Sequence, residues 1–320
     1  MNATALHVVA DERAEWLEWR RGGIGASDAA AVAGFSPFDT PTSIYLKKIG
    51  FLREDTGEEE DWQRAGRLLE PVTARWFEEV TGYEVRMPQL QVVHPERPWQ
   101  RATLDGVVYV DGEPAGPFES KSTTRWNGEW GTDPPDYYQA QVLHQMITTG
   151  ASRGWLAALV DGRSLRWWEI ERTDLDADLL TSVEEAFWLR VVKRRPPPVD
   201  GSERTNEALS SVYGPRPHPG IELLPAGKAL VDEYRAARDA RLAAEKAEAA
   251  AQNKVLALLE GAEVATFEGR PALKWSVIDR TTDDHAAVQP VIDYWYGGTP
   301  TKKTTHRRLW LPKPAKETAS

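Results

Sequence analysis

The sequence predicts an α/β (α+β) fold in which a mixed central sheet is flanked by helices, with a C-terminal extension of a long helix and a β-hairpin. Three observations predict it. Helical patterns fill most of residues 14–82, and short strand patterns follow over 83–124. A helix, a strand pair and a further helix then complete the order up to about residue 195. Elements in this order are typical of helices packed on a sheet.

The composition narrows the class of protein. The 320 residues are 41% hydrophobic, which is enough apolar material for a sizeable core, and they include no cysteine. Disulfides, thiolate metal sites and cysteine nucleophiles are therefore excluded. No stretch reaches the roughly 18 apolar residues of a spanning helix, and the first sixteen residues lack a signal-peptide pattern. We expect a soluble, cytoplasmic protein with no membrane association. The net charge of −10 argues against non-specific adhesion to nucleic acid, but it leaves room for local positive patches.

Helical patterns cover three stretches before the strands: 14–34, interrupted by a glycine turn, 41–52 and 62–82. Ser27 or Asp28 is expected to cap the short helix that follows the glycine turn. In the third stretch, Pro71 is expected to kink or restart the helix, and Gly82 to end it.

Strand patterns bounded by Gly, Pro and Asp turns cover 83–94, 101–110 and 116–124. A helix opened by prolines and closed by Gly150 is expected next, followed by a two-strand hairpin about the "DGR" of 161–163. A last helix ends before three consecutive prolines.

The C-terminal third differs in composition from the rest. We expect a nuclease-sized domain over 1–200, a Pro/Gly/Ser-rich linker over 201–226 and an accessory region over 227–320. The accessory region contains a long alanine-rich helix, a hairpin about "EGR" and a basic tail. The cations of that tail are Lys302, Lys303, Arg307, Arg308, Lys313 and Lys316. They are expected either to track phosphates or to protect a solvated edge strand from aggregation.

One constellation in the strand region carries chemistry. In "FESKSTT", Glu119 and Lys121 are two positions apart on a strand and therefore share a face. Asp105 ends the preceding strand, so a hairpin would bring it beside Glu119. Two carboxylates and a backbone carbonyl suit Mg²⁺ or Mn²⁺, and the lysine could orient or help deprotonate a water. Taken alone, Glu119 and Lys121 could equally be a weak ion pair on an ordinary charged strand face.

Other polar residues interrupt helices near this constellation. Glu70 lies beside the proline of an amphipathic helix. The helix 134–150 carries Gln139, Gln141, His144 and Gln145, of which at least two are expected to face solvent.

Four blocks then resemble a known family: "WRRGGIGASDAAAVAGFSPF", "GRLLEPVTARWFEEVTG", "LDGVV…FESKS" and "YYQAQVLHQMITTG". Together, in this order, they resemble the YqaJ-type viral recombinases, relatives of lambda exonuclease in the PD-(D/E)xK nuclease superfamily. The resemblance spans about residues 14–195 and implies a restriction-endonuclease-like core.

The resemblance also implies roles for residues. Asp105 and Glu119 match the metal-binding carboxylates, with the Ser120 carbonyl as a further ligand. Lys121 matches the lysine that positions the attacking water. Glu70 matches a glutamate that supports the metal site, and Gln141 matches an active-site glutamine. Two Mg²⁺ ions per site are expected, with Mn²⁺ as a substitute.

The stretch "RRGGIGAS" precedes a short helix, where free N–H groups favour an anion. An ordinary capped helix fits the local sequence equally well. In the related lambda exonuclease, a matching arginine and serine hold the 5′-phosphate of the DNA end, and Arg20 and Ser27 have that spacing here. The third residue of that pocket is a serine there, and Thr103 stands at the matching position.

The resemblance implies an Mg²⁺-dependent exonuclease that degrades double-stranded DNA from its ends in the 5′ to 3′ direction. The 3′ tails would pass to a single-strand annealing protein for phage-type recombination. A trimeric ring and a phage or prophage origin in a bacterial host are family expectations. Two alternatives remain open: an endonuclease or nickase on the same core, and a DNA-binding protein with a retired site.

Overall fold

The computed structural model of the chain has two compact units, divided between His218 and Pro219. The structure describes residues 7–8, 13–52, 60–88, 90–123, 130, 132–213, 220–283 and 301–310.

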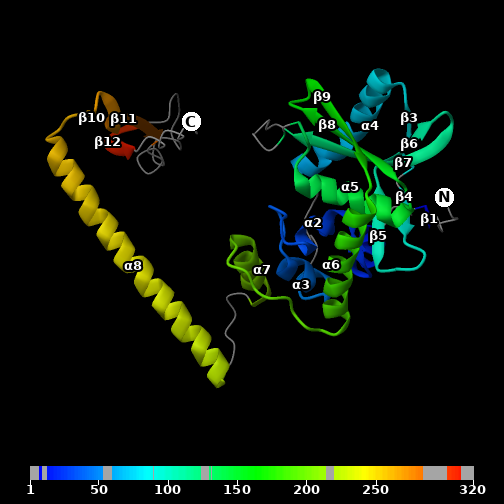
Figure 1. Cartoon of the computed structure of the whole chain (residues 1–320), viewed down its shortest axis with the longest axis horizontal. Helices are drawn as coiled ribbons and strands as arrows, with labels where there is room; N and C mark the ends of the chain where they lie inside the picture. The colour runs from blue at the N-terminus through cyan, green and yellow to red at the C-terminus, as the bar shows by residue number, and fades with distance from the viewer. Residues whose placement is uncertain are drawn as a thin grey trace, which may run out of the picture. The chain divides into compact units, whose positions relative to one another are not determined.

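The first unit is built on a five-stranded mixed sheet, which confirms the predicted fold class (Figure 1). In spatial order the strands are β3 (Glu84–Arg86), β6 (Gly106–Val110), β7 (Glu113–Thr123), β8 (Arg153–Val160) and β9 (Ser164–Glu171). Within this sheet the β7–β8 pair is parallel, while β3–β6, β6–β7 and β8–β9 are antiparallel. A parallel pair needs a crossover, and the helix α5 (Asp136–Thr149) supplies it.

Each face of this sheet packs against a helix. On one face, Phe77 of α4 (Asp61–Thr81) packs in a cluster with Phe118 and Trp155. On the other face, Met146 of α5 packs in a cluster with Leu156. Successive strand residues point to opposite faces. Because Phe118 points toward α4, its neighbour Glu119 points toward α5.

A second, four-stranded sheet continues from the first. Its order is β1 (His7–Val8), β4 (Leu90–Val93), β5 (Gln100–Leu104) and β2 (Ile24–Gly25). Strand β5 ends at Leu104 and β6 begins at Gly106, so Asp105 is the single residue between the two sheets. A Cβ at Gly106 would lie 3.1 Å from the Arg86 carbonyl oxygen, so glycine permits the close approach there.

The remaining helices of this unit are α1 (Arg13–Arg21), the 3₁₀ turn η1 (Ala26–Asp28), α2 (Ala29–Val32), α3 (Pro41–Lys48), α6 (Asp174–Val192) and α7 (Glu203–Tyr213). Ile24, Ile44 and Phe187 form the centre of a core between them. Helix α4 runs unbroken across Pro71, so the expected restart is wrong. Pro71 is exposed, where water can replace its missing hydrogen bond. Gly82 and Gly150 end their helices with φ of 76° and 75°, as predicted.

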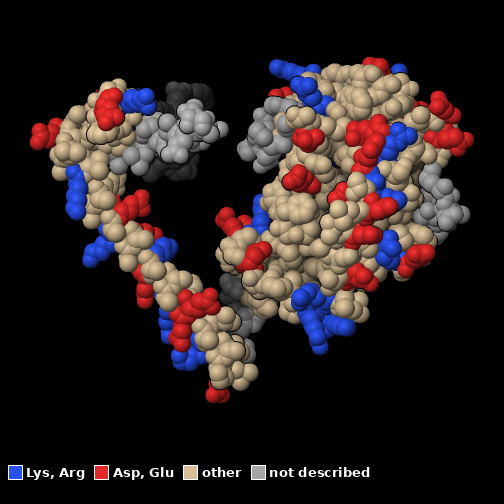
Figure 2. Space-filling view, in the orientation of Figure 1, with Lys and Arg blue, Asp and Glu red and all other residues tan. Residues whose placement is uncertain are grey.

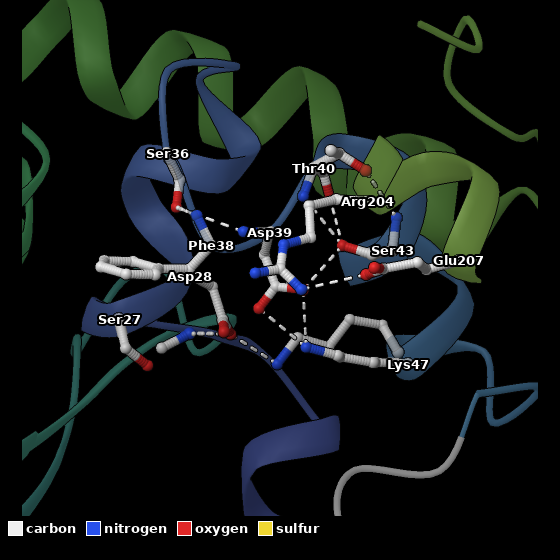
Figure 3. A network of polar contacts seen from close by, with 12 residues as sticks. Ser27, Asp28, Ser36, Phe38, Asp39, Thr40, Ser43, Lys47, Arg204 and Glu207 are labelled. Atoms are coloured by element: carbon white, nitrogen blue, oxygen red, sulfur yellow. Dashed lines mark hydrogen bonds and ion pairs between the residues drawn. The ribbon is translucent and has the colours of Figure 1, made fainter. Parts of the chain in front are cut away.

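Helix α7 occupies part of the range expected to be a linker. The hydroxyl groups of Thr40 and Thr205 form a buried 2.8 Å hydrogen bond between the start of α3 and α7. Ala208 lies in the same core as Ile44. Figure 3 shows Arg204 and Glu207 of α7 beside the polar residues at the start of α3. Residues 203–213 therefore belong to the first unit rather than to a linker.

The second unit contains the long helix and the hairpin that the sequence predicts. These elements are α8 (Pro225–Leu259), β10 (Val264–Phe267), β11 (Arg270–Asp283) and β12 (Thr301–Trp310). Figure 2 shows acidic and basic side chains mixed along α8. Two of the pairs, Lys228–Asp232 and Arg241–Glu245, are ion pairs at i,i+4 spacing, which favours a solvated helix.

The basic tail is only partly described. Lys302, Lys303, Arg307 and Arg308 lie on β12, whose backbone pairs with β11, but their side chains are outside the description. Lys313 and Lys316 lie outside the described residues. No helix among the described residues is long and apolar enough to cross a membrane.

Candidate functional site

The centre of the site is the Glu119 carboxylate, which is only 2% exposed. Lys121 Nζ and Gln141 Nε2 both donate to its Oε1 at 2.5 Å. Lys121 comes from the same face of β7, and Gln141 comes from α5 above that face. The structure therefore brings together three of the residues that the sequence singled out.

Asp105 reaches this centre from the junction of the two sheets. Its Oδ2 accepts a 2.9 Å hydrogen bond from the backbone N–H of Ser120 on the neighbouring strand. Burial raises the pKa of Asp105 well above its ordinary value, and the negative charge of Glu119 raises it further. Lys121 and the Ser120 N–H lower this pKa, but they do not compensate fully.

Glu70 lies half-buried on α4, where its carboxylate feels the charge of Glu119. Burial raises its pKa first, and the charge of Glu119 raises it further, against smaller opposing effects of Lys121 and Arg67. Asp105, Glu119 and Glu70 are thus carboxylates that disfavour one another's charge, a situation that a cation would relieve.

The Lys121 ammonium remains charged in this arrangement. Burial lowers its pKa, but the charges of Glu119 and Asp105 outweigh burial, and the net effect is to raise it. The Nζ atom also lies 5.1 Å from the centre of the Tyr138 ring, a cation–π contact. In this arrangement the lysine supplies a positive charge and donates a hydrogen bond to Glu119.

Gln145 belongs to this site, although the sequence analysis gave it no role. Its Nε2 donates to Glu119 Oε2 at 2.6 Å, so α5 holds both carboxylate oxygens from consecutive turns through Gln141 and Gln145. Gln145 is fully buried, and its Oε1 has no hydrogen-bond partner among the described residues. The i,i+4 spacing places Gln141 and Gln145 on one face of the helix, but the sequence does not show which face meets the sheet.

His144, on the next face of α5, is also fully buried. Of the four residues of which at least two were expected to face solvent, Gln139 and Gln141 are only partly exposed, and His144 and Gln145 are buried. The Nδ1 of His144 lies 2.7 Å from Glu184 Oε1, and its Nε2 lies 2.9 Å from the Arg101 carbonyl oxygen. Burial lowers the pKa of His144, but Glu184 and the carbonyl raise it above its ordinary value. Gln100 Nε2 donates to the other oxygen of Glu184 at 2.8 Å. This network fastens α5 to α6 and β5.

The residues expected to hold a 5′-phosphate form a second cluster. One Arg20 nitrogen donates to Ser27 Oγ at 3.0 Å, and the guanidinium lies 4.9 Å from the Trp16 ring centre. The Trp16 indole N–H in turn donates to Thr103 Oγ1 at 3.4 Å. Arg20 therefore bonds Ser27 directly and is connected to Thr103 through Trp16, a residue that the sequence analysis did not identify.

The buried carboxylate of Asp28 holds Arg20 in this cluster. Asp28 accepts from Arg20 at 2.9 Å, from Lys48 at 2.7 Å and from the Gly25 N–H at 3.0 Å. Burial alone would raise the pKa of Asp28, but Lys48 and Arg20 bring it far below its ordinary value. Asp28 stands at the N-cap position of α2 without a side-chain capping bond, so the expected cap is wrong for this residue. Its carboxylate is used for ion pairs instead.

The glycine turn lets this cluster approach β5. A Cβ at Gly23 would lie 2.5 Å from the Trp99 carbonyl oxygen, and that oxygen accepts the Ile24 N–H at 2.6 Å. Only glycine allows this distance.

Comparison with known proteins places this site in a family. Residues 15–152 match the model of the YqaJ-like viral recombinase domain. The uncharacterized protein YqaJ of Bacillus subtilis (strain 168) is 32% identical over 228 residues, which cover 69% of this chain and 70% of that protein.

The chain belongs to the YqaJ-like viral recombinase family. This confirms the resemblance seen in the sequence. All the residues expected at the two clusters, from Arg20 to Gln141, lie within the matched range, whereas the second unit lies outside it.

Two solved structures are similar to parts of this YqaJ-like chain. An alkaline exonuclease (LHK-Exo) from Laribacter hongkongensis has 22% identity and a TM-score of 0.47, with 57% of this chain and 94% of that chain covered. A phage-related exonuclease from Haemophilus somnus 129PT has 11% identity and a TM-score of 0.39, with 54% and 96% covered.

The YqaJ-like site suits a hard cation by the chemistry of its donors. Within the described residues, no group of three or more His, Asp or Glu side chains is arranged to hold a metal ion by itself. The expected set relies instead on the carboxylates of Asp105 and Glu119 and on the Ser120 carbonyl, which are oxygen donors of the kind that Mg²⁺ prefers. Crowded carboxylates and the orphaned Gln145 Oε1 both fit a site that is completed by a cation and water.

Proposed function

We propose that this protein is an Mg²⁺-dependent deoxyribonuclease that degrades double-stranded DNA from its ends in the 5′ to 3′ direction. The observation that carries the proposal is the Glu119 carboxylate, held by Lys121 and Gln141 beside Asp105. Family membership and this geometry together support a deoxyribonuclease.

Asp105, Glu119 and the Ser120 carbonyl would hold Mg²⁺, with Glu70 in support. Two ions per site are proposed, with Mn²⁺ as a substitute. Such ions stabilise the attacking and leaving oxygens of a phosphodiester.

The side chains of the site have separate tasks. Gln141 and Gln145 fix the orientation of Glu119 from α5. Lys121 supplies a positive charge and a hydrogen-bond donor toward the attacking water and the phosphate. Its hydrogen bond to Glu119 keeps the ammonium beside the carboxylates proposed to hold the metal, where it would position the attacking water.

The cluster of Arg20, Ser27 and Thr103 supports the choice of DNA ends. A guanidinium and two hydroxyl groups are suitable donors for a terminal 5′-phosphate, and Asp28 fixes the guanidinium beside Ser27. Recognition of a 5′-phosphate would give the enzyme its 5′ to 3′ direction and leave 3′ single-stranded tails.

Three further points of the proposal come from the family resemblance. The tails pass to a single-strand annealing protein for recombination, the enzyme assembles as a trimeric ring around DNA, and it works in the cytoplasm of a bacterial host. Lys302, Lys303, Arg307 and Arg308 are proposed as additional phosphate contacts.

Digestion of DNA by the purified protein tests the proposal. The substrates are linear duplexes with 5′-phosphate or 5′-hydroxyl ends and closed circles, each with Mg²⁺, Mn²⁺ or EDTA. We expect loss of the 5′-phosphorylated strand only, with Mg²⁺ or Mn²⁺. Cutting of circles would indicate an endonuclease or nickase, and no digestion at all would indicate a retired site.

An arginine variant tests the phosphate pocket separately. Arg20→Gln should abolish the preference for 5′-phosphate over 5′-hydroxyl ends. Arg86→Gln is the matched control, because Arg86 is half-exposed on β3 and pairs with Glu84. An unchanged preference in Arg20→Gln would remove this cluster from end recognition.

A further inference from the structure

Phe38 is an aromatic side chain that is 56% exposed on a fixed turn. The turn joins α2 to α3. Ser36 Oγ accepts the backbone N–H of Phe38 at 3.1 Å and that of Asp39 at 3.4 Å. Asp39 is itself held by Lys47, which donates to both carboxylate oxygens at 2.8 Å. Figure 3 shows the Phe38 ring projecting away from this polar network.

A series of ring contacts connects Phe38 to the catalytic lysine. The Phe38 and Tyr137 ring centres are 5.4 Å apart, and those of Tyr137 and Tyr138 are 4.4 Å apart. Lys121 Nζ then lies 5.1 Å from the Tyr138 ring centre. The exposed ring is thus joined to Lys121 by three successive contacts.

The same turn is also connected to the phosphate cluster. Ser27 lies in η1, which is followed by helix α2, and α2 leads into the turn. Ala29 of α2 packs with Ile147 of α5, so the turn and the catalytic helix are fixed relative to one another. Phe38 is thus connected to both clusters by packing and ring contacts.

The geometry of the Phe38–Tyr137 pair leaves room for a flat ligand. Their planes are at 88°, an edge-to-face arrangement. In such a pair, Tyr137 covers at most one face of the Phe38 ring, and the 56% exposure of Phe38 leaves ring surface for a planar ligand. The flat apolar surfaces of a DNA substrate are its bases, and base–aromatic stacking tolerates every sequence.

We propose that Phe38 is a stacking platform for a nucleobase near the DNA end that is bound at this site. The inference rests on the proposed function, because it takes DNA as the ligand. Stacking would hold the terminal nucleotide in register between Arg20 and Lys121.

Fluorescence of 2-aminopurine tests this proposal directly. The probe is a 5′-phosphorylated duplex with 2-aminopurine at one of the first three nucleotides from the end, on each strand in turn, with Ca²⁺ in place of Mg²⁺. The variants are Phe38→Ala, Phe38→Leu and Phe38→Trp. Phe51→Ala is the matched control, since Phe51 is a second exposed phenylalanine, 63% exposed, just after α3.

We expect the wild-type protein to quench one probe position by stacking. Phe38→Ala and Phe38→Leu should lose that quenching and bind the duplex about fivefold or more weakly, the lower limit for the loss of one base–aromatic stack. Phe38→Trp should retain both properties, and Phe51→Ala should behave as wild type. Phe38→Leu keeps an apolar side chain, so its failure would separate stacking from packing.

Different results overturn different statements. If wild-type protein neither binds nor digests duplex DNA, the proposed function fails and the stacking role fails with it. If wild-type protein digests DNA but Phe38→Ala matches Phe51→Ala in quenching and binding, only the stacking role is wrong. Self-association of wild type that Phe38→Ala abolishes, with DNA binding unchanged, would identify the ring as a contact between copies of the chain.

Discussion

Asp28→Asn tests whether the Asp28 carboxylate stabilises the cluster of Arg20, Ser27 and Thr103. Asp28 is 3% exposed, and its carboxylate contacts Lys48 at 2.7 Å and Arg20 at 2.9 Å. The Lys48 side chain is fully buried. The substitution keeps the shape of the side chain and removes its charge. Arg20 and Lys48 then repel each other without the intervening carboxylate.

The expected loss of stability follows from burial. Removing one partner of a buried ion pair costs about 3–5 kcal/mol. Asp39→Asn is the matched control on the neighbouring segment, because the Asp39–Lys47 pair is partly exposed, at 33% and 23%. An exposed pair of this kind contributes at most about 1 kcal/mol.

Urea unfolding, followed by tryptophan fluorescence, measures both changes. The midpoint of Asp28→Asn should fall well below that of Asp39→Asn, with the slope of the transition unchanged. Combining Asp28→Asn with Lys48→Met should recover much of the loss, because the buried cation is removed with its partner. Equal midpoints for Asp28→Asn and Asp39→Asn would refute the argument that burial makes Asp28 a structural anchor.

The remaining predictions concern the catalytic cluster and its support. Lys121→Ala should reduce cleavage of linear duplex about 10²- to 10³-fold while gel-shift binding is retained, and retained cleavage would exclude the lysine from the mechanism. Gln145→Met removes a hydrogen-bond donor from Glu119. It should therefore lower cleavage activity, or raise the Mg²⁺ concentration for half-maximal cleavage, by about 10- to 100-fold. Gln139→Met, which makes no contact with Glu119, should do neither. The pKa of His144 in the folded protein is raised. The pair of His144 with Glu184 therefore stabilises the fold fully below the pKa of the unfolded state, and this contribution is lost as the pH rises through the pKa of the folded state. His144→Gln should therefore cost about 1.5–3 kcal/mol at pH 6 and less at pH 9 in urea unfolding, and a cost independent of pH would contradict the charged assignment.

Local patterns were sufficient to predict most of the secondary structure. The alternation around Glu119 and Lys121 correctly predicted a strand with both side chains on one face. Gly82 and Gly150 marked helix ends because φ is positive there, which glycine adopts without strain. Asp105 was singled out as the residue that ends a strand, and the resemblance added Gln141; the structure brings both to the Glu119 region.

Tertiary contacts determined what the sequence could not reveal. Nothing local distinguishes the buried Gln145 from the more exposed Gln139, because the difference depends on which face of α5 meets the sheet. The local sequence around Asp28 predicted a helix cap. It could not reveal the ion pair of Asp28 with the buried Lys48, because Lys48 lies on a different helix. Glu184, which pairs with His144, lies forty residues away in the sequence.

The docking of α7 sets where the catalytic unit can be cut from the rest of the chain. Loss of α7 would remove Thr205, the hydroxyl partner of Thr40, at the first turn of α3. It would also open the apolar cluster of Ile44 and Phe187 to water at Ala208. Proteolytic trimming that stops at residue 213 should therefore release a soluble nuclease fragment, whereas trimming to residue 200 should release one that aggregates.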